Sequence, residues 1–512
     1  MSNTPASPSP EYPRAGRREW LGLAVLVLPT LLLALDMTVL HLAAPHLSAD
    51  LEPSSSELLW ILDIYGFMVA GFLITMGTLG DRIGRRRLLL IGATAFGLAS
   101  LAAAFAHSSM MLIATRALLG VAGATLMPST LALIRNMFHV EHERTLAITI
   151  WMTGFIVGSA IGPLVGGVML AFFWWGSVFL LAVPVMVLLL LVGPWLLPEF
   201  RDEQAGRLDL TSALLCICAV LLLIFGIKDS ARDGLNLLAS SALLAGLLVG
   251  TLFVRRQRRL AEPMFDLALF RQPAFSVSVA AMMLCILALS GAWLLIFQYL
   301  QGALGMTPLQ AGLVMLPSAL LQTAASLLVP RMARWLAPRV LISGGLLVAV
   351  AGFVALLLIG RYPGPGLMVL ATVLLGIGIM PMMILGTDLV IGSAPPEKTG
   401  AAAATSETAT EMGMALGIAV IGSIGAAVYR YRMLELMPPG LSDHQLEVAS
   451  DTVGGALGLA SHLPDALAAA VMSAVQVSLT QALQTNALIG AVVMLGAAWL
   501  TGRYLAAVRP GH

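Results

Sequence analysis

Charged residues are scarce in this sequence. Asp, Glu, Lys and Arg make up 11% of the 512 residues, whereas a soluble protein carries about 25%. Hydrophobic residues make up 59% of the chain, and that much apolar surface cannot be buried in a water-soluble fold. The composition therefore predicts a polytopic membrane protein with the lipid bilayer as its solvent. The formal net charge of +1 indicates no nucleic-acid partner.

Cysteines and catalytic motifs are also scarce. The three cysteines, Cys216, Cys218 and Cys285, lie in apolar runs, so we interpret them as packing residues and expect neither a disulfide framework nor a metal site. The sequence contains no H-E-x-x-H, G-x-S-x-G or glycine-rich phosphate loop, and no soluble domain that could bind ATP. These absences argue against a membrane-embedded enzyme and predict a protein without a cofactor.

Long apolar runs dominate what is present. A membrane helix needs about 20 mostly apolar residues, which predicts an all-α fold. The candidate spans number fourteen: 20–42, 57–80, 88–106, 109–134, 146–172, 176–197, 209–228, 235–254, 273–300, 309–330, 339–360, 366–393, 399–428 and 484–508. The first run is longer than the apolar core of a signal peptide, and AAPHLSADLEP is a poor cleavage site, so we interpret that run as a retained span.

The distribution of Lys and Arg predicts the orientation of these spans. Arginines precede the first span and follow every second one, and Lys228 is one of the few exceptions. Neither Lys nor Arg occurs in the loops 43–56, 107–108, 173–175 and 301–308. The pattern predicts that both termini are cytoplasmic. Segment 429–483 would then lie outside, and its helical periodicity leaves two alternatives, a helical hairpin over the outer mouth or a mobile loop.

The string GTLGDRIGRRRLLL joins the second and third spans. Gly77 and Gly84 allow a tight turn and close helix approach. Asp81 can cap a helix start and pair with a nearby arginine. The arginines of this string that we single out are Arg82, Arg85 and Arg86.

The fourth and fifth spans carry two further unusual strings. Arg116, in LIATRALLG, lies inside the fourth span, where a charge needs a partner or water. Small residues in GSAIGPLVGG would let a neighbouring helix pack closely, and Pro163 favours a kink because it removes a helix hydrogen bond. The glycines of this string are Gly158, Gly162, Gly166 and Gly167.

Together with LDMTVLHLAAP in the first span, these strings resemble the motifs of the major facilitator superfamily. Within it they are similar to the fourteen-span drug:proton antiporters, and GSAIGPLVGG fits the antiporter motif in full. LLWILDIYGFMVAG and SETATEMGMALG favour the QacA and SmvA type, which exports quaternary ammonium compounds and other cationic biocides. His41 replaces the usual Asn, Leu119 replaces the usual Gln, and the loop motif of the second half survives only as PRMARWLAPR.

The resemblance implies two six-helix bundles plus two extra transmembrane helices, with alternating access by rocking of the bundles. The corresponding parts are a cytoplasmic tail (1–19), an N-terminal bundle (20–200), the two extra helices with linkers (201–272) and a C-terminal bundle (273–512). It also implies a monomer in the bacterial inner membrane that exports mono- and divalent organic cations in exchange for protons. The alternatives are export of an endogenous metabolite or a neutral antibiotic, and a receptor that has lost transport.

Four carboxylates within the apolar runs are candidates for proton coupling and cation binding: Asp36, Asp63, Glu407 and Glu411. A carboxylate at membrane depth is costly unless it is neutral, paired or hydrated, so one site that holds either a proton or a cation is the simplest basis for exchange. Glu407 and Glu411 are one helical turn apart and share a face. The alternative for each carboxylate is a structural hydrogen bond between helices.

Two further groups complete the candidate site. The family fold brings Arg116 beside the first span, so we expect it within reach of Asp36. Four aromatic side chains are candidate cation–π contacts, with packing or lipid contact as the alternative: Trp60, Tyr65, Trp151 and Phe155.

Overall fold

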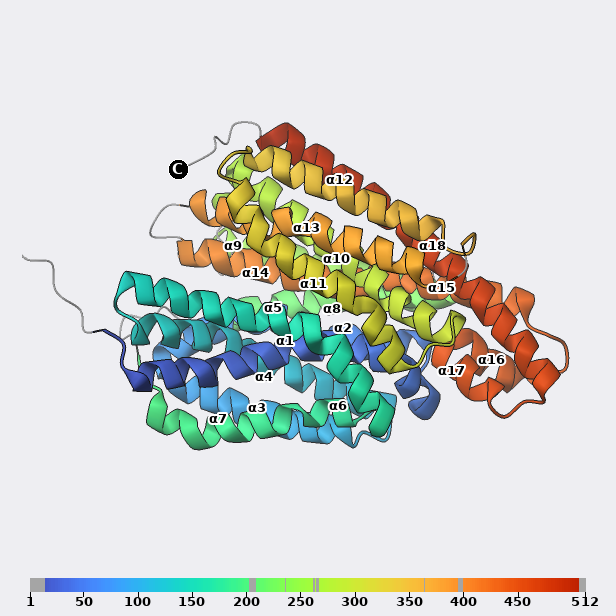
Figure 1. The fold of residues 1–512 in the computed structure, drawn as a ribbon. Coiled ribbons are helices and arrows are strands. Elements are labelled where there is room, and N and C mark those ends of the chain that lie inside the picture. The colour runs from blue at the N-terminus through green and yellow to red at the C-terminus, as the bar shows by residue number, and fades with distance from the viewer. Residues whose placement is uncertain are drawn as a thin grey trace, which may run out of the picture.

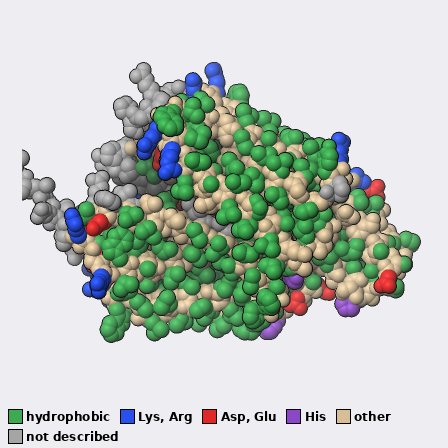
Figure 2. Space-filling view, viewed as in Figure 1, with side chains coloured by type: hydrophobic (Ala, Val, Ile, Leu, Met, Phe, Trp, Pro, Cys, Tyr) green, Lys and Arg blue, Asp and Glu red, His purple; other side chains and the backbone are tan. Residues whose placement is uncertain are grey.

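The computed structural model describes residues 14–201, 209–234, 236–260, 263, 267–362, 364–394 and 399–505, and nearly all of them are helical. The long helices run side by side, and the described chain begins and ends at the same end of the molecule, which we call the terminal end (Figure 1). The surface between the two ends is mainly hydrophobic, as a lipid-facing surface requires (Figure 2).

The N-terminal half consists of α1 (Arg17–Leu51), α2 (Ser55–Ile83), α3 (Arg85–Ala104), α4 (Ser109–Met137), α5 (Glu141–Phe172), α6 (Ser177–Leu180) and α7 (Ala182–Leu196). An extra pair follows, α8 (Leu210–Asp233) and α9 (Leu237–Gln257). The C-terminal half consists of η1 (Leu269–Arg271), α10 (Pro273–Gln298), η2 (Tyr299–Ala303), α11 (Pro308–Met332), α12 (Pro338–Leu357), α13 (Gly366–Gly392), α14 (Thr399–Leu416), η4 (Gly417–Gly422), α15 (Ser423–Leu436), α16 (Asp443–Asp451), α17 (Val453–Ala460) and α18 (Asp465–Tyr504).

The predicted number of spans is confirmed for the described residues. Thirteen helices are long and apolar enough to cross a membrane, and α5 is a fourteenth once its two parts are counted together. The parts, Leu146–Ser159 and Ile161–Phe172, meet at 45°. Pro163 explains the bend, because its ring removes the hydrogen bond to the carbonyl of residue 159 and crowds that carbonyl.

Each half packs as its own group of helices. In the N-terminal half α1 packs on α5, α2 on α4, and α3 on α4 and α7; in the C-terminal half α12 packs on α13 and α18, and α10 on α14 and α18. The halves lie on opposite sides of a shared interface in which α5 contacts α11 and α2 contacts α14 (Figure 1).

The two helices of the extra pair differ in their location, whereas the family resemblance implied that both lie at the periphery. Helix α9 is mostly exposed and packs on α8, where Gly226 and Gly246 allow close approach. Helix α8, however, contacts α2 of the N-terminal half and both η4 and α15 of the C-terminal half. It therefore lies along the seam between the halves.

The segment 429–483 is mainly helical. The sequence had left two alternatives for it, a helical hairpin or a mobile loop. Its first residues continue α15 to Leu436, its middle forms α16 and α17, and α18 begins at Asp465 instead of residue 484. The last predicted span was therefore too short at its start, because an amphipathic extension of a membrane helix has weaker hydropathy than the span itself. Helices α16 and α17 lie at the end of the molecule opposite the terminal end (Figure 1).

The halves close against each other near the α16–α17 end. The side-chain amide of Gln301 in η2 donates a hydrogen bond of 3.0 Å to the carbonyl of Leu42 in α1. Gly454 of α17 lies against the carbonyl of Pro45. Gly312 of α11 lies against the backbone of Pro163. Any opening at this end must break these contacts.

Candidate functional site

An ion pair between α1 and α4 stands at the centre of the N-terminal half. Nη1 of Arg116 lies 2.7 Å from Oδ2 of Asp36, and the two side chains are 2% and 13% exposed. Nε of Arg116 donates to the carbonyl of Ile61 at 3.2 Å, and the guanidinium carbon lies 4.7 Å from the ring centroid of Tyr65. Arg116 is therefore within reach of Asp36 as expected, and its burial is compensated by a carboxylate, a carbonyl and a ring.

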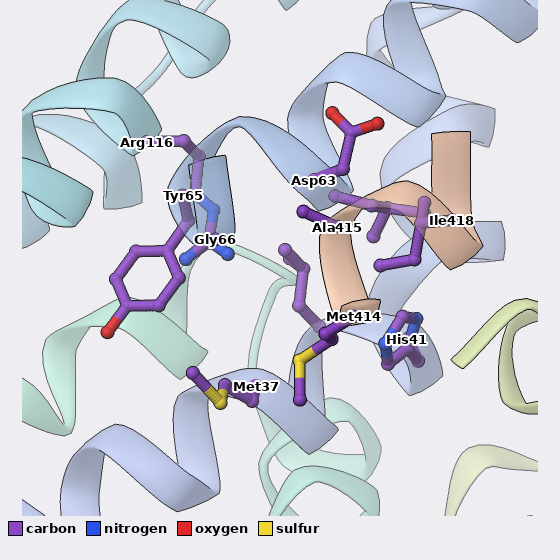
Figure 3. Close-up of a pocket in the computed structure, with 11 residues that line it drawn as sticks. Met37, His41, Asp63, Tyr65, Gly66, Arg116, Met414, Ala415 and Ile418 are labelled. Atoms are coloured by element: carbon purple, nitrogen blue, oxygen red, sulfur yellow. The ribbon is translucent and has the colours of Figure 1, made fainter. Parts of the chain in front are cut away.

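A small cavity of about 20 Å³ borders this pair on the side of the C-terminal half. Figure 3 shows its walls. The lining comes from α1, α2 and α4 of one half and from α14 and η4 of the other, and comprises Met37, Leu40, His41, Leu62, Asp63, Tyr65, Gly66, Arg116, Met414, Ala415 and Ile418. We call it the central cavity. Methionine and leucine walls with a few charged groups suit a lipophilic ligand that carries charge only once the two halves move apart, because the closed cavity has room for about one water molecule.

A second ion pair lies beside the central cavity. Oδ2 of Asp63 on α2 is 2.7 Å from Nζ of Lys228 on α8, and the side chains are 0% and 1% exposed. The ammonium also lies 4.1 Å from the ring centroid of Trp60. From the sequence we proposed Asp63 as a candidate site residue. We did not propose Lys228, which we interpreted only as an exception to the pattern of Lys and Arg. A lysine inside an apolar run is itself a signal for a buried partner.

The two glutamates of α14 differ in their surroundings. Glu411 is 8% exposed, and its Oε2 has no hydrogen-bond partner among the described residues. Its backbone carbonyl lies beside Gly66 of α2. Glu407, one turn closer to the terminal end, is exposed. The pair therefore presents one accessible and one enclosed carboxylate on the same helix.

The four aromatic candidates separate into two kinds. Tyr65 lines the central cavity and Trp60 faces Lys228, so both lie against cations of the protein itself. Trp151 is buried, and its indole nitrogen donates to Oγ1 of Thr130 at 3.2 Å, which makes it a packing contact between α5 and α4. Phe155 is half-buried on α5.

The comparisons with known proteins agree with this architecture. The sequence model of the Major Facilitator Superfamily matches residues 26–418. The chain belongs to the Major Facilitator Superfamily. It is therefore a transporter and not an enzyme.

Several members of this superfamily are similar over most of their length. The multidrug efflux pump LfrA of Mycolicibacterium smegmatis is 43% identical over 494 residues, which cover 96% of this chain and 98% of LfrA. The methyl viologen resistance protein SmvA of Salmonella typhimurium is 38% identical over 470 residues, which cover 89% and 92%. These matches confirm the resemblance drawn from the sequence motifs.

Solved structures confirm the fold. A crystal structure of a bacterial homologue of the human lysosomal transporter Spinster, in an inward-facing and unoccupied conformation, superposes with a TM-score of 0.62. The identity is 16%, and the match covers 96% of this chain and 98% of that chain.

The superfamily's loop string is folded against the end of α7. Gly84 has φ +111°, a conformation that favours glycine, and the Glu199 side chain occupies the space where a Cβ would stand. Asp81 pairs with Arg85 at 2.6 Å, as the sequence predicted. The capping role predicted for Asp81 is wrong, because α3 begins after Gly84 without a side-chain cap.

The remaining residues of the loop string divide between packing and exposure. Arg86 donates to the carbonyl of Leu197 at 3.0 Å and lies 3.6 Å from Glu199, whereas Arg82 is exposed. Gly77 lies near Pro128 of α4. The loop therefore ties the terminal ends of α2, α3 and α7 together.

The glycines of α5 lie where two helices approach closely. Gly158 lies against the carbonyl of Leu31, Gly162 against Thr38 and Gly166 against Val39, all on α1. Gly167 instead faces Leu309 of α11, in the opposite half. This helix thus connects the helix that carries Asp36 to the interface between the halves.

Proposed function

We propose that this protein is a proton-coupled multidrug efflux antiporter that exports lipophilic mono- and divalent organic cations, such as quaternary ammonium compounds, dyes, biguanides and viologens. The observation that carries the proposal is the set of enclosed carboxylates at the central cavity and on the helices that line it. Asp63 lines the cavity, and Asp36 is paired with the lining residue Arg116. Glu411 lies on α14, which also contributes to the lining. Asp36 and Asp63 have cationic partners, whereas Glu411 has none among the described residues.

The two similar proteins support the substrate class. LfrA is named as a multidrug efflux pump and SmvA as a methyl viologen resistance protein. Methyl viologen is a divalent organic cation. Carboxylates on α1, α2 and α14 give such a cation partners in a poorly hydrated space, where their attraction is strong.

The same carboxylates provide the coupling. A carboxylate enclosed in a membrane holds either a proton or a cation, so entry of substrate from one side and of protons from the other can alternate at one site. Arg116 gives Asp36 a cationic partner at 2.7 Å. The proton gradient supplies the energy, and no cofactor is required.

The positions of the arginines indicate the orientation of the protein in the membrane. The loop string with Arg85 and Arg86 and the start of α1 with Arg17 and Arg18 lie at the terminal end, which we assign to the cytoplasm of a bacterial inner membrane. Closure at the α16–α17 end then corresponds to a conformation that accepts substrate from the cytoplasm, and Glu407 is exposed toward that side.

One similar protein favours a second candidate. The tetracenomycin C resistance and export protein of Streptomyces glaucescens is 31% identical over 412 residues, which cover 80% of this chain and 76% of that protein. Export of an uncharged antibiotic by the same exchange is the corresponding alternative. Uptake of ethidium into everted vesicles, with a proton gradient imposed and then collapsed, tests the favoured function. Gradient-dependent uptake supports it, and uptake of uncharged antibiotics alone supports the alternative.

A further inference from the structure

Asp63 and Lys228 join one of the paired bundles to the extra helix pair. Asp63 is a residue of α2 and lines the central cavity. Lys228 belongs to α8, which lies along the seam between the halves. The extra pair therefore contributes a charged side chain to the edge of the central site.

The contact between them is ionic and leaves one carboxylate oxygen free. Only Oδ2 of Asp63 lies close to Nζ, at 2.7 Å. Oδ1 of Asp63 has no hydrogen-bond partner among the described residues. A buried ion pair that serves only to join helices gains stability when all its hydrogen-bonding groups are satisfied, and this pair does not meet that condition.

The two partners border different spaces. Lys228 lines a second cavity of about 20 Å³, nearer the α16–α17 end, together with Ser55, Ser56, Leu59, Ser423, Ala426, Ala427 and Arg430. Three serine hydroxyls there can accept an ammonium group. Arg430 does not oppose it strongly, because its own charge is paired with Asp451 at 2.7 Å.

We propose that Lys228 is an internal counter-cation for Asp63, displaced into this second cavity when an organic cation in the central cavity takes the carboxylate. The inference rests on the proposed function, since it requires a cationic substrate. The long flexible side chain of lysine allows the movement, and the serine hydroxyls of the second cavity offer the ammonium partners after it leaves the carboxylate.

This role sets the affinity and the selectivity of the site. Competition from Lys228 weakens substrate binding, because a substrate cation can bind Asp63 only during the fraction of time in which Lys228 has left it. It also keeps an enclosed carboxylate compensated when no substrate is bound, as the membrane interior requires. Neutral ligands do not compete with Lys228 for Asp63, so removal of Lys228 should change the binding of cations and not that of uncharged compounds.

Binding of ethidium to the purified full-length protein at pH 8, measured by fluorescence anisotropy, tests the inference. Lys228→Gln should tighten binding about tenfold, because the competitor is gone. Lys228→Arg should weaken it about tenfold, because a guanidinium can hold both oxygens of Asp63 and is harder to displace. Asp63→Asn/Lys228→Gln leaves no uncompensated charge and should bind ethidium more weakly than Lys228→Gln.

The pair of Asp209 and Arg256 provides a matched control. It joins α8 to α9 at 2.9 Å, near the terminal end, and Asp209→Asn/Arg256→Gln should change ethidium affinity less than about twofold. Equal affinities for wild type, Lys228→Arg and the Asp63→Asn/Lys228→Gln protein would overturn the inference and leave the pair as a helix contact. Failure of the proposed function is a different result, namely binding without proton-driven efflux by the wild type.

Discussion

Asp36 of α1 and Arg116 of α4 lie 2.7 Å apart, and both side chains are largely shielded from solvent. The pair stands beside a cavity that both halves line, and we propose that it takes part in proton coupling. A change in either residue should therefore affect coupling before it affects substrate recognition.

Asp36→Asn should abolish proton-driven efflux of every substrate, because the amide retains the shape but cannot exchange a proton. Binding of an uncharged or weakly bound ligand should change little. Substrate uptake into everted vesicles at matched expression measures this export activity, with Trp151→Phe as a control at a packing position. Efflux by Asp36→Asn at the wild-type rate would remove Asp36 from the coupling mechanism.

Arg116 should be required as a positive charge. Arg116→Gln leaves Asp36 enclosed without its cation, at a cost of about 3–5 kcal/mol in stability, and should abolish transport. Arg116→Lys should keep part of the activity, although it cannot contact Asp36, the Ile61 carbonyl and the Tyr65 ring at once. Thermal unfolding and efflux of both variants distinguish the charge from the packing. Equal activity of the two would contradict the role of charge.

The two glutamates of α14 should discriminate between substrates by charge. A divalent cation can engage both carboxylates one turn apart, whereas a monovalent one needs a single carboxylate. Glu407→Gln and Glu411→Gln should therefore impair methyl viologen and bisbiguanides more than ethidium. Resistance and efflux measured with one substrate of each kind test this expectation. Equal losses for both kinds in both variants would disprove charge matching.

The glycine stripe of α5 should be required for packing on α1. A Cβ at Gly158 would meet the backbone carbonyl of Leu31, which cannot move as a side chain can, so Gly158→Ala should cost about 1–3 kcal/mol of stability. Gly344→Ala, at a helical glycine of α12 with no atom within 4 Å of the added Cβ, serves as the control and should be neutral or slightly stabilising. Thermal unfolding in detergent compares them. A midpoint for Gly158→Ala equal to that of the control would exclude the close contact.

Much of this architecture was predictable from the sequence, for physical reasons. Hydropathy predicts the spans, because a single apolar segment in lipid must satisfy its backbone hydrogen bonds within itself, as a helix does. Pro163 predicted the bend of α5, because proline lacks an amide hydrogen. The approach of Arg116 to Asp36 came from a motif resemblance, since spacing does not tell which helices are neighbours.

Other features were beyond the sequence. Which face of α8 meets α2 depends on packing, so the partner of Asp63 could not be identified, although Lys228 inside an apolar run required one. Trp151 was a candidate cation–π contact because it is aromatic, but the structure shows that it is a packing residue. The start of α18 at Asp465 was missed because the helix continues past the membrane-spanning part.

The most direct measurement is transport by purified protein in liposomes with an imposed proton gradient. Ethidium or methyl viologen is added on one side, and the internal pH is followed with a trapped dye while substrate movement is recorded. The account predicts that wild-type protein moves substrate against its concentration gradient while protons move the opposite way, and that Asp36→Asn does neither. Substrate movement by the wild type without any accompanying proton movement would contradict it.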